Sequence, residues 1–383
     1  MIIGQFCETY PPELDGVGRV MLSYCCALKK MGHRCMYIAP ENPNYAHTPE
    51  CETLLYKGMP IPRELYRIGV PGFTRTYRRA AREIPFDLVH AHSPFLAGRA
   101  ARRIARRRSI PLVATFHSKF YDDFYRVTHS KALAQLALQY VLSFYRSCDE
   151  VWAVNECTAQ VLREYGYRGE IVAMPNGTNP LSVTDEEYAD ALRRFPLLDE
   201  TPTLLFVGQM DFKKNTRNIL RACAKLSGEG FAYQLLMVGE GQDSKSLHAL
   251  AQELGFAQKA RFTGFVAERH VVLSLYRRAD LLVFPSVYDN APMVVREAAA
   301  MGTPALLLAE SCAAEGIVHG ENGFLCRNTV ESIAEGIRSA VPSAQAVGAR
   351  ARETIPIPWE QLMRDVLARY QKLIDSKRER SNP

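Results

Sequence analysis

The sequence lacks a long apolar run: no window of its 383 residues approaches the length of about 18 that a membrane-spanning helix needs. Its first residues, MIIGQFCETYPPELDG, lack a basic segment followed by an apolar stretch, so no secretory signal is expected. The 10 cysteines include no C-x-x-C pair, which gives no indication of a zinc site, and we expect reduced thiols. These absences predict a cytoplasmic chain without a metal centre.

What the sequence does contain is typical of a folded protein of more than one domain. Apolar residues make up 47% and charged residues 23%, which excludes a disordered chain. The net charge of +6 is uneven: residues 1–180 hold 23 Lys and Arg against 16 Asp and Glu, an excess of +7. A basic surface binds nucleic acid, anionic lipid or a phosphorylated small molecule, so such a partner is expected on the first half.

Short apolar runs alternate with helical periods twice along the chain. Met1–Cys7 and Cys35–Ala39 predict buried strands on either side of a helix, and Thr203–Val207 starts a second alternation. The other candidate strands are Asp87–His90, Leu112–Thr115, Val151–Val154, Ile171–Met174, Gln234–Val238, Arg261–Gly264, Leu281–Pro285 and Pro304–Leu308. The pattern predicts an α/β protein of two domains, residues 1–178 and 179–356, with a final helix at 357–375 packing back on the first.

A glycine-containing turn, Asp15-Gly16-Val17-Gly18, separates the first strand from the first helix. Glycine at this place lets backbone N–H groups approach a phosphate, and a helix N-terminus favours negative charge. The third glycine of the dinucleotide-binding fingerprint is missing, because Met21 and Leu22 occupy its neighbourhood. The turn therefore predicts either a phosphate contact at Gly16 or a tight turn alone.

The segment Phe284–Pro304 carries two carboxylates eight positions apart. Asp289 lies in a loop after a strand, and Glu297 lies early in a helix that begins near Pro292. Backbone N–H groups at such a helix start can hold a diphosphate, and the two carboxylates can accept hydrogen bonds from sugar hydroxyls. The alternative is a solvated loop acid and an unrelated helix acid, which the surrounding residues disfavour.

This segment resembles the E-x7-E region of the retaining glycosyltransferases of family 4, and the resemblance extends over nearly the whole chain. It implies the GT-B architecture, which consists of two Rossmann-like doubly wound domains facing a cleft. The other motifs that carry it are Pro11–Val17, Gly32-His33, Val89–Pro94, Thr115–Ser118, Pro175–Gly177, Phe206–Gly208, Lys214-Asn215, Val238–Gly241, Phe262–Gly264 and Asn322–Phe324. Each is weak alone, but their order and spacing together are specific.

The resemblance also implies site residues. His117, Asp289 and Lys214 correspond to the catalytic positions: His117 and Asp289 contact the transferred sugar, and Lys214 neutralises the donor diphosphate. Glu297 corresponds to the glutamate that holds the nucleotide ribose. The implied donor-binding set is Gly16, Gln209, Lys214, Asp289, Asn290, Met293, Val294 and Glu297, and the acceptor-side residues are His92 and Tyr121.

Two residues depart from the family pattern. Asp289 replaces a glutamate and is one methylene shorter. Gln209 stands where many members have an arginine, so it offers a neutral amide in place of a charged fork. Diphosphate neutralisation then depends more on Lys214, with Lys213 as its neighbour. We interpret the departures as those of a subgroup, although a weakened site is the alternative.

His90 and His92 could suggest a metal pair, but no third ligand accompanies them, and the family implies no metal and no cofactor. Structural roles are therefore favoured for this pair. Phe120, Tyr121, Phe124 and Tyr125 follow His117 and predict either an apolar acceptor wall or core packing.

Arginines gather on two expected helices. One set falls at helical spacing on a single face: Arg75, Arg78, Arg79 and Arg82. The second set is Arg99, Arg102, Arg103, Arg106, Arg107 and Arg108. These stripes predict either solvated faces or contact with an anionic membrane surface through Arg75, Arg78, Arg79 and Arg82. Nucleic acid is not expected, because no basic platform with interleaved aromatic residues is present.

Together these features predict a retaining hexosyltransferase that uses a nucleotide sugar, with UDP-glucose as first donor and GDP-mannose as second. The pattern is most like that of bacterial diacylglycerol glucosyltransferases. It implies a membrane-lipid acceptor and a cytoplasmic protein attached peripherally to the inner face of the cell membrane. The alternatives are a transferase acting on a soluble or polysaccharide acceptor, a sugar-nucleotide epimerase, and a non-catalytic sugar-nucleotide binding protein.

Overall fold

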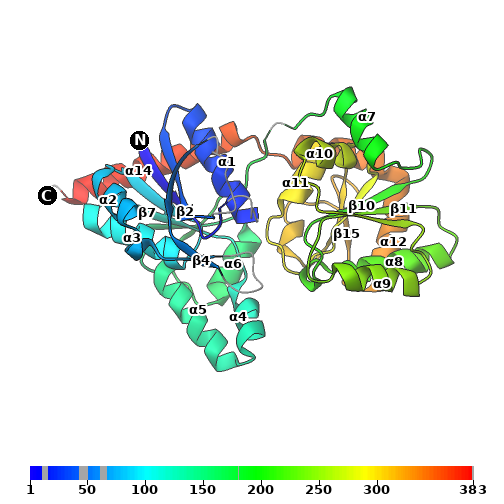
Figure 1. Cartoon of the computed structure of the whole chain (residues 1–383), viewed down its shortest axis with the longest axis horizontal. Helices are drawn as coiled ribbons and strands as arrows, with labels where there is room; N and C mark the ends of the chain where they lie inside the picture. The colour runs from blue at the N-terminus through cyan, green and yellow to red at the C-terminus, as the bar shows by residue number, and fades with distance from the viewer. Residues whose placement is uncertain (11–15, 43–50, 61–66, 180, 382–383) are drawn as a thin grey trace. The chain divides into compact units, whose positions relative to one another are not determined.

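The computed structural model describes residues 1–10, 16–42, 51–60, 67–179 and 181–381. The chain divides into two compact units (Figure 1). Unit 1 contains Met1–Gly177 and Pro358–Pro383, and unit 2 contains Thr178–Ile357. Each unit is built around one parallel sheet with helices in its crossovers, so the predicted doubly wound α/β class is confirmed for both.

The sheet of unit 1 has seven strands in the order β3-β2-β1-β6-β7-β8-β9, all parallel. Their bounds are β1 Ile2–Phe6, β2 Arg34–Pro40, β3 Glu52–Tyr56, β6 Leu88–Ala91, β7 Leu112–Phe116, β8 Glu150–Ala153 and β9 Ile171–Ala173. The central strands β6 and β7 are buried along their whole length, because helices cover both faces of the sheet. A separate antiparallel pair is formed by β4 (Gly58–Pro60) and β5 (Arg67–Gly69).

The helices of unit 1 connect these strands. Their bounds are α1 Gly16–Lys30, η1 Pro71–Phe73, α2 Arg75–Glu83, α3 Leu96–Arg108, α4 Phe120–Thr128, α5 Lys131–Tyr145, α6 Glu156–Glu164 and α14 Trp359–Ser381. The last helix, α14, packs on α1 and buries Trp359, Val366 and Tyr370. It runs further than the expected 357–375, because the charged residues from Lys377 continue it. Lys377 Nζ donates to Asp149 Oδ1 at 2.6 Å.

Unit 2 has a six-stranded parallel sheet in the order β12-β11-β10-β13-β14-β15. The strands are β10 Thr203–Val207, β11 Gln234–Val238, β12 Ala260–Gly264, β13 Leu281–Val283, β14 Ala305–Leu308 and β15 Phe324–Cys326. The helices are α7 Asp185–Arg194, η2 Phe212–Lys214, α8 Thr216–Gly228, α9 Ser244–Glu253, α10 Arg269–Arg278, α11 Met293–Ala300, η3 Cys312–Ala314, α12 Val330–Ala340, η4 Val341–Ser343 and α13 Ala344–Thr354. Helix α7 begins at a capping box between Thr184 and Glu187 and packs on α10.

Two further expectations can be compared with the structure. The expectation of reduced thiols is met at eight of the 10 cysteines, which form no disulfide: Cys7, Cys25, Cys26, Cys35, Cys51, Cys148, Cys223 and Cys326. No helix among the described residues is long and apolar enough to cross a bilayer.

Candidate functional site

In unit 2 two loops meet where neighbouring strands end. The loop after β10 contains η2 with Lys214, and the loop after β13 contains Asp289. Because β10 and β13 are adjacent and parallel, both loops leave the same edge of the sheet, where ligands of doubly wound sheets bind. Lys214 Nζ donates to both carboxylate oxygens of Asp289 at 2.7 Å. The structure therefore brings together two of the three residues predicted as catalytic.

Ser286 and Asn215 fix this pair in place, and neither was identified from the sequence as a site residue. The fully buried Ser286 hydroxyl lies 2.5 Å from Asp289 Oδ2 and donates to it. Asn215, which adopts a left-handed conformation with φ 60°, donates from its side chain to the Pro285 carbonyl at 3.1 Å. The Lys214 backbone N–H is capped by the Asp211 carboxylate at 3.2 Å. These contacts hold the two loops in one arrangement.

Glu297 lies in α11 with a partner that sequence reasoning missed. The Arg269 guanidinium, on α10, lies 2.8 Å from Glu297 Oε1, and the Tyr276 hydroxyl donates to Glu297 Oε2 at 3.4 Å. Burial opposes the charge on Arg269, but the attraction of Glu297 outweighs it and raises the arginine pKa. The Glu297 side chain is only 8% exposed, so α10 and α11 hold this carboxylate in a defined position.

The other predicted donor-binding residues of unit 2 surround these pairs. Met293 and Val294 form the first turn of α11, whose first N–H groups have no acceptor within the helix and can bind an anion. Asn290 is buried just before that turn, and Gln209 is exposed after β10. Backbone packs tightly here: a Cβ on Gly239 would lie 2.0 Å from the Gly208 carbonyl oxygen.

Gly16 belongs to unit 1 and is the first residue of α1. Residues 11–15, which include Asp15 of the predicted phosphate turn, lie outside the described residues.

Three histidines of unit 1 form one hydrogen-bonded network at the ends of β6 and β7. His92 Nδ1 lies 3.0 Å from His117 Nε2, and His92 Nε2 lies 2.8 Å from Gln5 Oε1. Gln5 Nε2 donates to the Tyr370 hydroxyl at 3.3 Å, and this hydroxyl lies 2.6 Å from His90 Nδ1. The predicted residues His92 and His117 are therefore in direct contact.

The network fixes which nitrogens carry protons. The Gln5 carbonyl oxygen can only accept, so His92 Nε2 carries a hydrogen and His92 Nδ1 must accept from His117 Nε2. Burial lowers the pKa of His117 to about 3 and lowers the pKa values of His90 and His92 well below the ordinary range. His117 is thus a neutral imidazole with Nδ1 as its acceptor nitrogen, and it is a weak general base.

The histidine network predicts that acid destabilises unit 1. The unfolded chain binds protons at its histidines below about pH 6.5, whereas the folded network does not, so stability is present above that pH and is lost as the pH falls. Each histidine that stays neutral lowers the free energy of unfolding by about 1–2 kcal/mol between pH 7.5 and pH 5.

Urea titrations at the two pH values measure this loss. Tryptophan fluorescence reports on unit 1 alone, because both tryptophans, Trp152 and Trp359, lie there. His117→Asn removes one contributor and should reduce the pH dependence; an unchanged pH dependence in this variant would contradict the assignment of His117.

The structure shows the contacts of the two histidines and of the aromatic residues that follow His117. His90 uses its ring nitrogens on Tyr370 and on Thr115, and no group of three metal-ligating side chains exists among the described residues. Phe120, Tyr121 and Phe124 pack against the core of unit 1, so core packing accounts for three of the four aromatic residues. The fourth, Tyr125, is 43% exposed.

Comparison with known proteins identifies the two units. Residues 14–180 match the family model described as Glycosyltransferase Family 4, and residues 189–353 match Glycosyl transferases group 1. The alpha-monoglucosyldiacylglycerol synthase of Streptococcus pneumoniae is 23% identical over 80% of this chain and 70% of its own length. A GDP-mannose-dependent alpha-mannosyltransferase of Corynebacterium glutamicum is 25% identical over 96% of this chain and 88% of its own.

The fold comparison agrees with these matches. A sucrose-phosphate synthase from Thermosynechococcus elongatus superimposes with a TM-score of 0.82 and 22% identity, covering 98% of this chain and 99% of its own. This likeness confirms the predicted GT-B class of two Rossmann-like units. The chain belongs to the glycosyltransferases, with a family 4 unit followed by a group 1 unit.

Proposed function

We propose that the protein is a retaining hexosyltransferase that moves a sugar from a nucleotide sugar to a membrane lipid, with UDP-glucose as first donor and GDP-mannose as second. The observation that carries this proposal is the Lys214–Asp289 pair beside the N-terminus of α11. It places a cation, a carboxylate and helix N–H groups at one sheet edge. These are the groups that a sugar diphosphate requires.

In this proposal each group has a separate task. Lys214 and the first turn of α11 bind the diphosphate and stabilise the charge that develops as it leaves. Asp289, which holds Lys214 in the structure, accepts hydrogen bonds from hydroxyls of the transferred sugar. Glu297 accepts from the ribose hydroxyls. No cofactor and no metal enter the proposal.

The proposed transfer occurs on one face of the sugar. The bond from the anomeric carbon to the diphosphate oxygen breaks, and the bond to the acceptor hydroxyl oxygen forms on the same face. The acceptor proton passes to the leaving diphosphate oxygen. His117, as a neutral imidazole, orients the sugar through a hydrogen bond to its Nδ1 and takes no proton. The protein thus contributes orientation and charge stabilisation.

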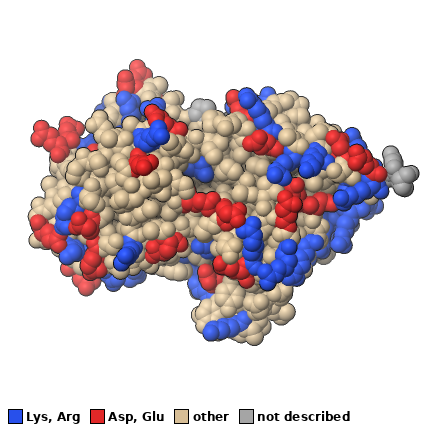
Figure 2. Space-filling view, turned by 180° about the vertical axis from the view of Figure 1, so that it is seen from behind, with Lys and Arg blue, Asp and Glu red and all other residues tan. Residues whose placement is uncertain are grey.

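An exposed apolar hairpin in unit 1 supports a lipid acceptor. Helices α4 and α5 pack on each other, and together they form the lower protrusion in Figure 2, which is mostly uncharged. Val127, Leu133 and Leu136 are exposed there by 76%, 52% and 67%. Apolar side chains that gather on a protruding surface favour contact with a membrane or a partner. The Streptococcus pneumoniae relative is by its name an alpha-monoglucosyldiacylglycerol synthase, and glucosyldiacylglycerol is a lipid.

A panel of nucleotide sugars tests the function. Each donor is incubated alone, with vesicles that contain diacylglycerol, or with soluble glycans, and the released nucleoside diphosphate and the glycosylated product are measured. We expect release of UDP or GDP that depends on the lipid, and an α-linked product by NMR. Transfer only to soluble glycans would contradict the lipid acceptor and identify a glycan acceptor. An altered nucleotide sugar would identify an epimerase, and donor binding without release of UDP or GDP would identify a non-catalytic protein.

The hairpin gives a prediction of its own. Leu136→Asp should weaken binding to neutral vesicles about tenfold or more, because burial of a leucine side chain contributes about 1.5–3 kcal/mol. Leu198 of unit 2 is 66% exposed, against 67% for Leu136, so Leu198→Asp is the matched control and should leave vesicle binding unchanged. Equal losses in both variants, measured by co-sedimentation, would rule out the hairpin as the membrane contact.

A further inference from the structure

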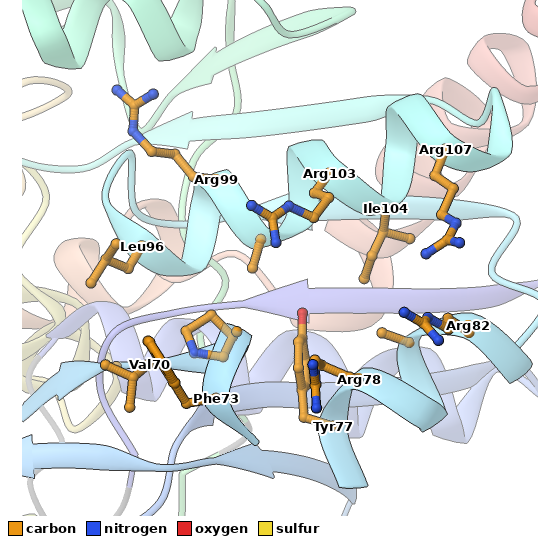
Figure 3. Close-up of a pocket in the computed structure, with 15 residues that line it drawn as sticks. Val70, Phe73, Tyr77, Arg78, Arg82, Leu96, Arg99, Arg103, Ile104 and Arg107 are labelled. Atoms are coloured by element: carbon orange, nitrogen blue, oxygen red, sulfur yellow. The ribbon is translucent and has the colours of Figure 1, made fainter. Parts of the chain in front are cut away.

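Unit 1 contains a cavity between two of its helices, and none of the residues assigned to sugar transfer lines it (Figure 3). Its walls come from η1 and α2 on one side and from α3 on the other. Its volume is about 340 Å³, which lies at the lower end of the range of about 300–1,000 Å³ for ligand pockets. The cavity therefore has room for a small ligand or for one segment of a larger one.

One end of the cavity is apolar. Val70, Phe73 and Leu96 gather there, and Phe73 and Leu96 are exposed by 85% and 39% (Figure 3). Ile104 extends the apolar wall along α3. Exposed aromatic and aliphatic side chains at the mouth allow an alkyl chain to continue from the cavity into an apolar phase outside.

Arginines line the rest of the cavity. Arg78 and Arg82 come from α2, and Arg103 and Arg107 face them from α3 (Figure 3). No carboxylate lines the cavity within the described part of the chain. The C-terminal ends of α2 and α3 lie here, and each dipole carries only about half a negative charge, so most of the positive charge is uncompensated. An anion bound at this end would relieve the repulsion between the arginines.

Two neighbouring side chains define the limits of the site. Arg99 also lines the cavity, but its guanidinium stacks 3.6 Å from the centre of the Tyr140 ring and donates to the Tyr140 carbonyl, so it is engaged with α5. The Tyr77 hydroxyl points toward α3 in Figure 3 and can donate to the same anion. The site thus combines four arginines from two facing helices, a hydroxyl and an apolar wall.

The structure places the arginines of the predicted stripe in two environments. The spacing of Arg75, Arg78, Arg79 and Arg82 predicted one helical face, either solvated or in contact with an anionic membrane surface. In the structure Arg78 and Arg82 line the cavity with arginines of α3, whereas Arg75 and Arg79 do not line it, and Arg79 lies 3.8 Å from Glu83 on the exposed surface. The four residues therefore have two different environments.

We infer that this cavity binds a single anionic phospholipid, with the phosphate held by Arg78, Arg82, Arg103 and Arg107 and an alkyl chain along Ile104, Leu96 and Phe73. Phosphate is the group that several arginines bind together through charge-assisted hydrogen bonds. The apolar end distinguishes a lipid from free phosphate. The inference goes beyond the proposed sugar transfer, because it concerns a lipid that is bound and not glycosylated.

Calorimetric titration with decyl phosphate below its micelle concentration tests this binding without donor, acceptor or membrane. We expect saturable binding of one molecule, and much weaker binding of inorganic phosphate and of decyl maltoside. Equal affinity for inorganic phosphate would leave only an anion site, and no saturable binding of decyl phosphate would overturn the inference.

Paired variants locate the site. Arg78→Gln with Arg82→Gln should weaken decyl phosphate binding by about tenfold or more, because two charge-assisted contacts are lost. Arg75→Gln with Arg79→Gln removes the same charge from the same helix, and the affinity should then change less than about threefold. Equal losses of decyl phosphate affinity in the two double variants would overturn the proposed site and indicate binding to a diffuse basic surface.

A third variant tests the apolar end without a change of charge. Ala100→Leu adds a side chain to the cavity wall and should weaken decyl phosphate binding while leaving that of inorganic phosphate unchanged. Thermal unfolding of each variant confirms that the protein is folded. Undiminished binding of decyl phosphate by a folded Ala100→Leu protein would overturn the placement of the chain.

Discussion

Replacing Lys214 by alanine is expected to lower kcat/KM for sugar transfer by about 100- to 1,000-fold, which is the loss seen when one preorganised charge-stabilising group is removed. Lys214 carries the cation at the sheet edge where the diphosphate is expected, and its side chain is only 18% exposed. The same change leaves the Asp289 carboxylate, 20% exposed, without its cation. Release of the nucleoside diphosphate in steady state measures the effect.

Gln209→Ala is the comparison variant, because Gln209 stands where an arginine is expected and offers a neutral amide. A neutral hydrogen bond contributes about 0.5–1.5 kcal/mol, so the loss should stay near tenfold or less. If Gln209→Ala proves the more damaging change, the proposed division of work between the two residues is wrong. Thermal unfolding of Lys214→Ala separates a loss of chemistry from a loss of folding.

The parallel strands were predictable from the sequence for a physical reason. A strand buried on both faces needs apolar residues without interruption, so the predicted bounds Thr203–Val207 and Gln234–Val238 coincide with β10 and β11. Strand β3, at Glu52–Tyr56, was not predicted. It lies at the edge of its sheet and is only partly buried, so its sequence carries a weaker apolar signal.

The contacts between site residues were less predictable from the sequence than the site residues themselves. The sequence identified Lys214 and Asp289 separately, but their contact depends on β10 and β13 being neighbours, which no local pattern encodes. Arg269 was missed because a single arginine in an amphipathic helix resembles any solvated residue. Helical spacing likewise placed four arginines on one face of α2 and could not show that α3 would close a cavity over only two of them.

In the histidine network, too, the roles of the side chains depend on contacts between residues far apart in the sequence. The motif around His90 and His92 was compatible with a metal pair until partners could be assigned. Gln5 comes from β1 and Tyr370 from α14, at opposite ends of the chain, and each contacts one ring nitrogen of the pair. Thr115 and His117 contact the other two ring nitrogens. Burial keeps His117 neutral, and its hydrogen bond to His92 uses Nε2, which limits the reactions that it can support.

Glu297→Ala is expected to weaken binding of the donor's nucleoside diphosphate by about 100-fold. The proposed site loses an acceptor for two ribose hydroxyls, and hydrogen bonds to a charged group contribute about 1.5–3 kcal/mol each. The carboxylate is nearly buried and is held by Arg269, so it meets the ribose without reorganisation. Calorimetric titration with UDP and with GDP measures the loss, and unchanged affinity for both would remove Glu297 from the site.

Arg269→Ala distinguishes a binding role of Glu297 from a structural one. Removing Arg269 leaves the 8% exposed carboxylate without its cation, so the variant should lose stability, whereas Glu297→Gln keeps a neutral acceptor in place. The double variant combines Arg269→Ala with Glu297→Ala. If Glu297 serves only to pair with Arg269, the double variant should bind nucleotide with the same affinity as Arg269→Ala alone, measured at a temperature where both are folded. If Glu297 binds the ribose, the double variant should bind nucleotide as weakly as Glu297→Ala, because both variants lack the same carboxylate.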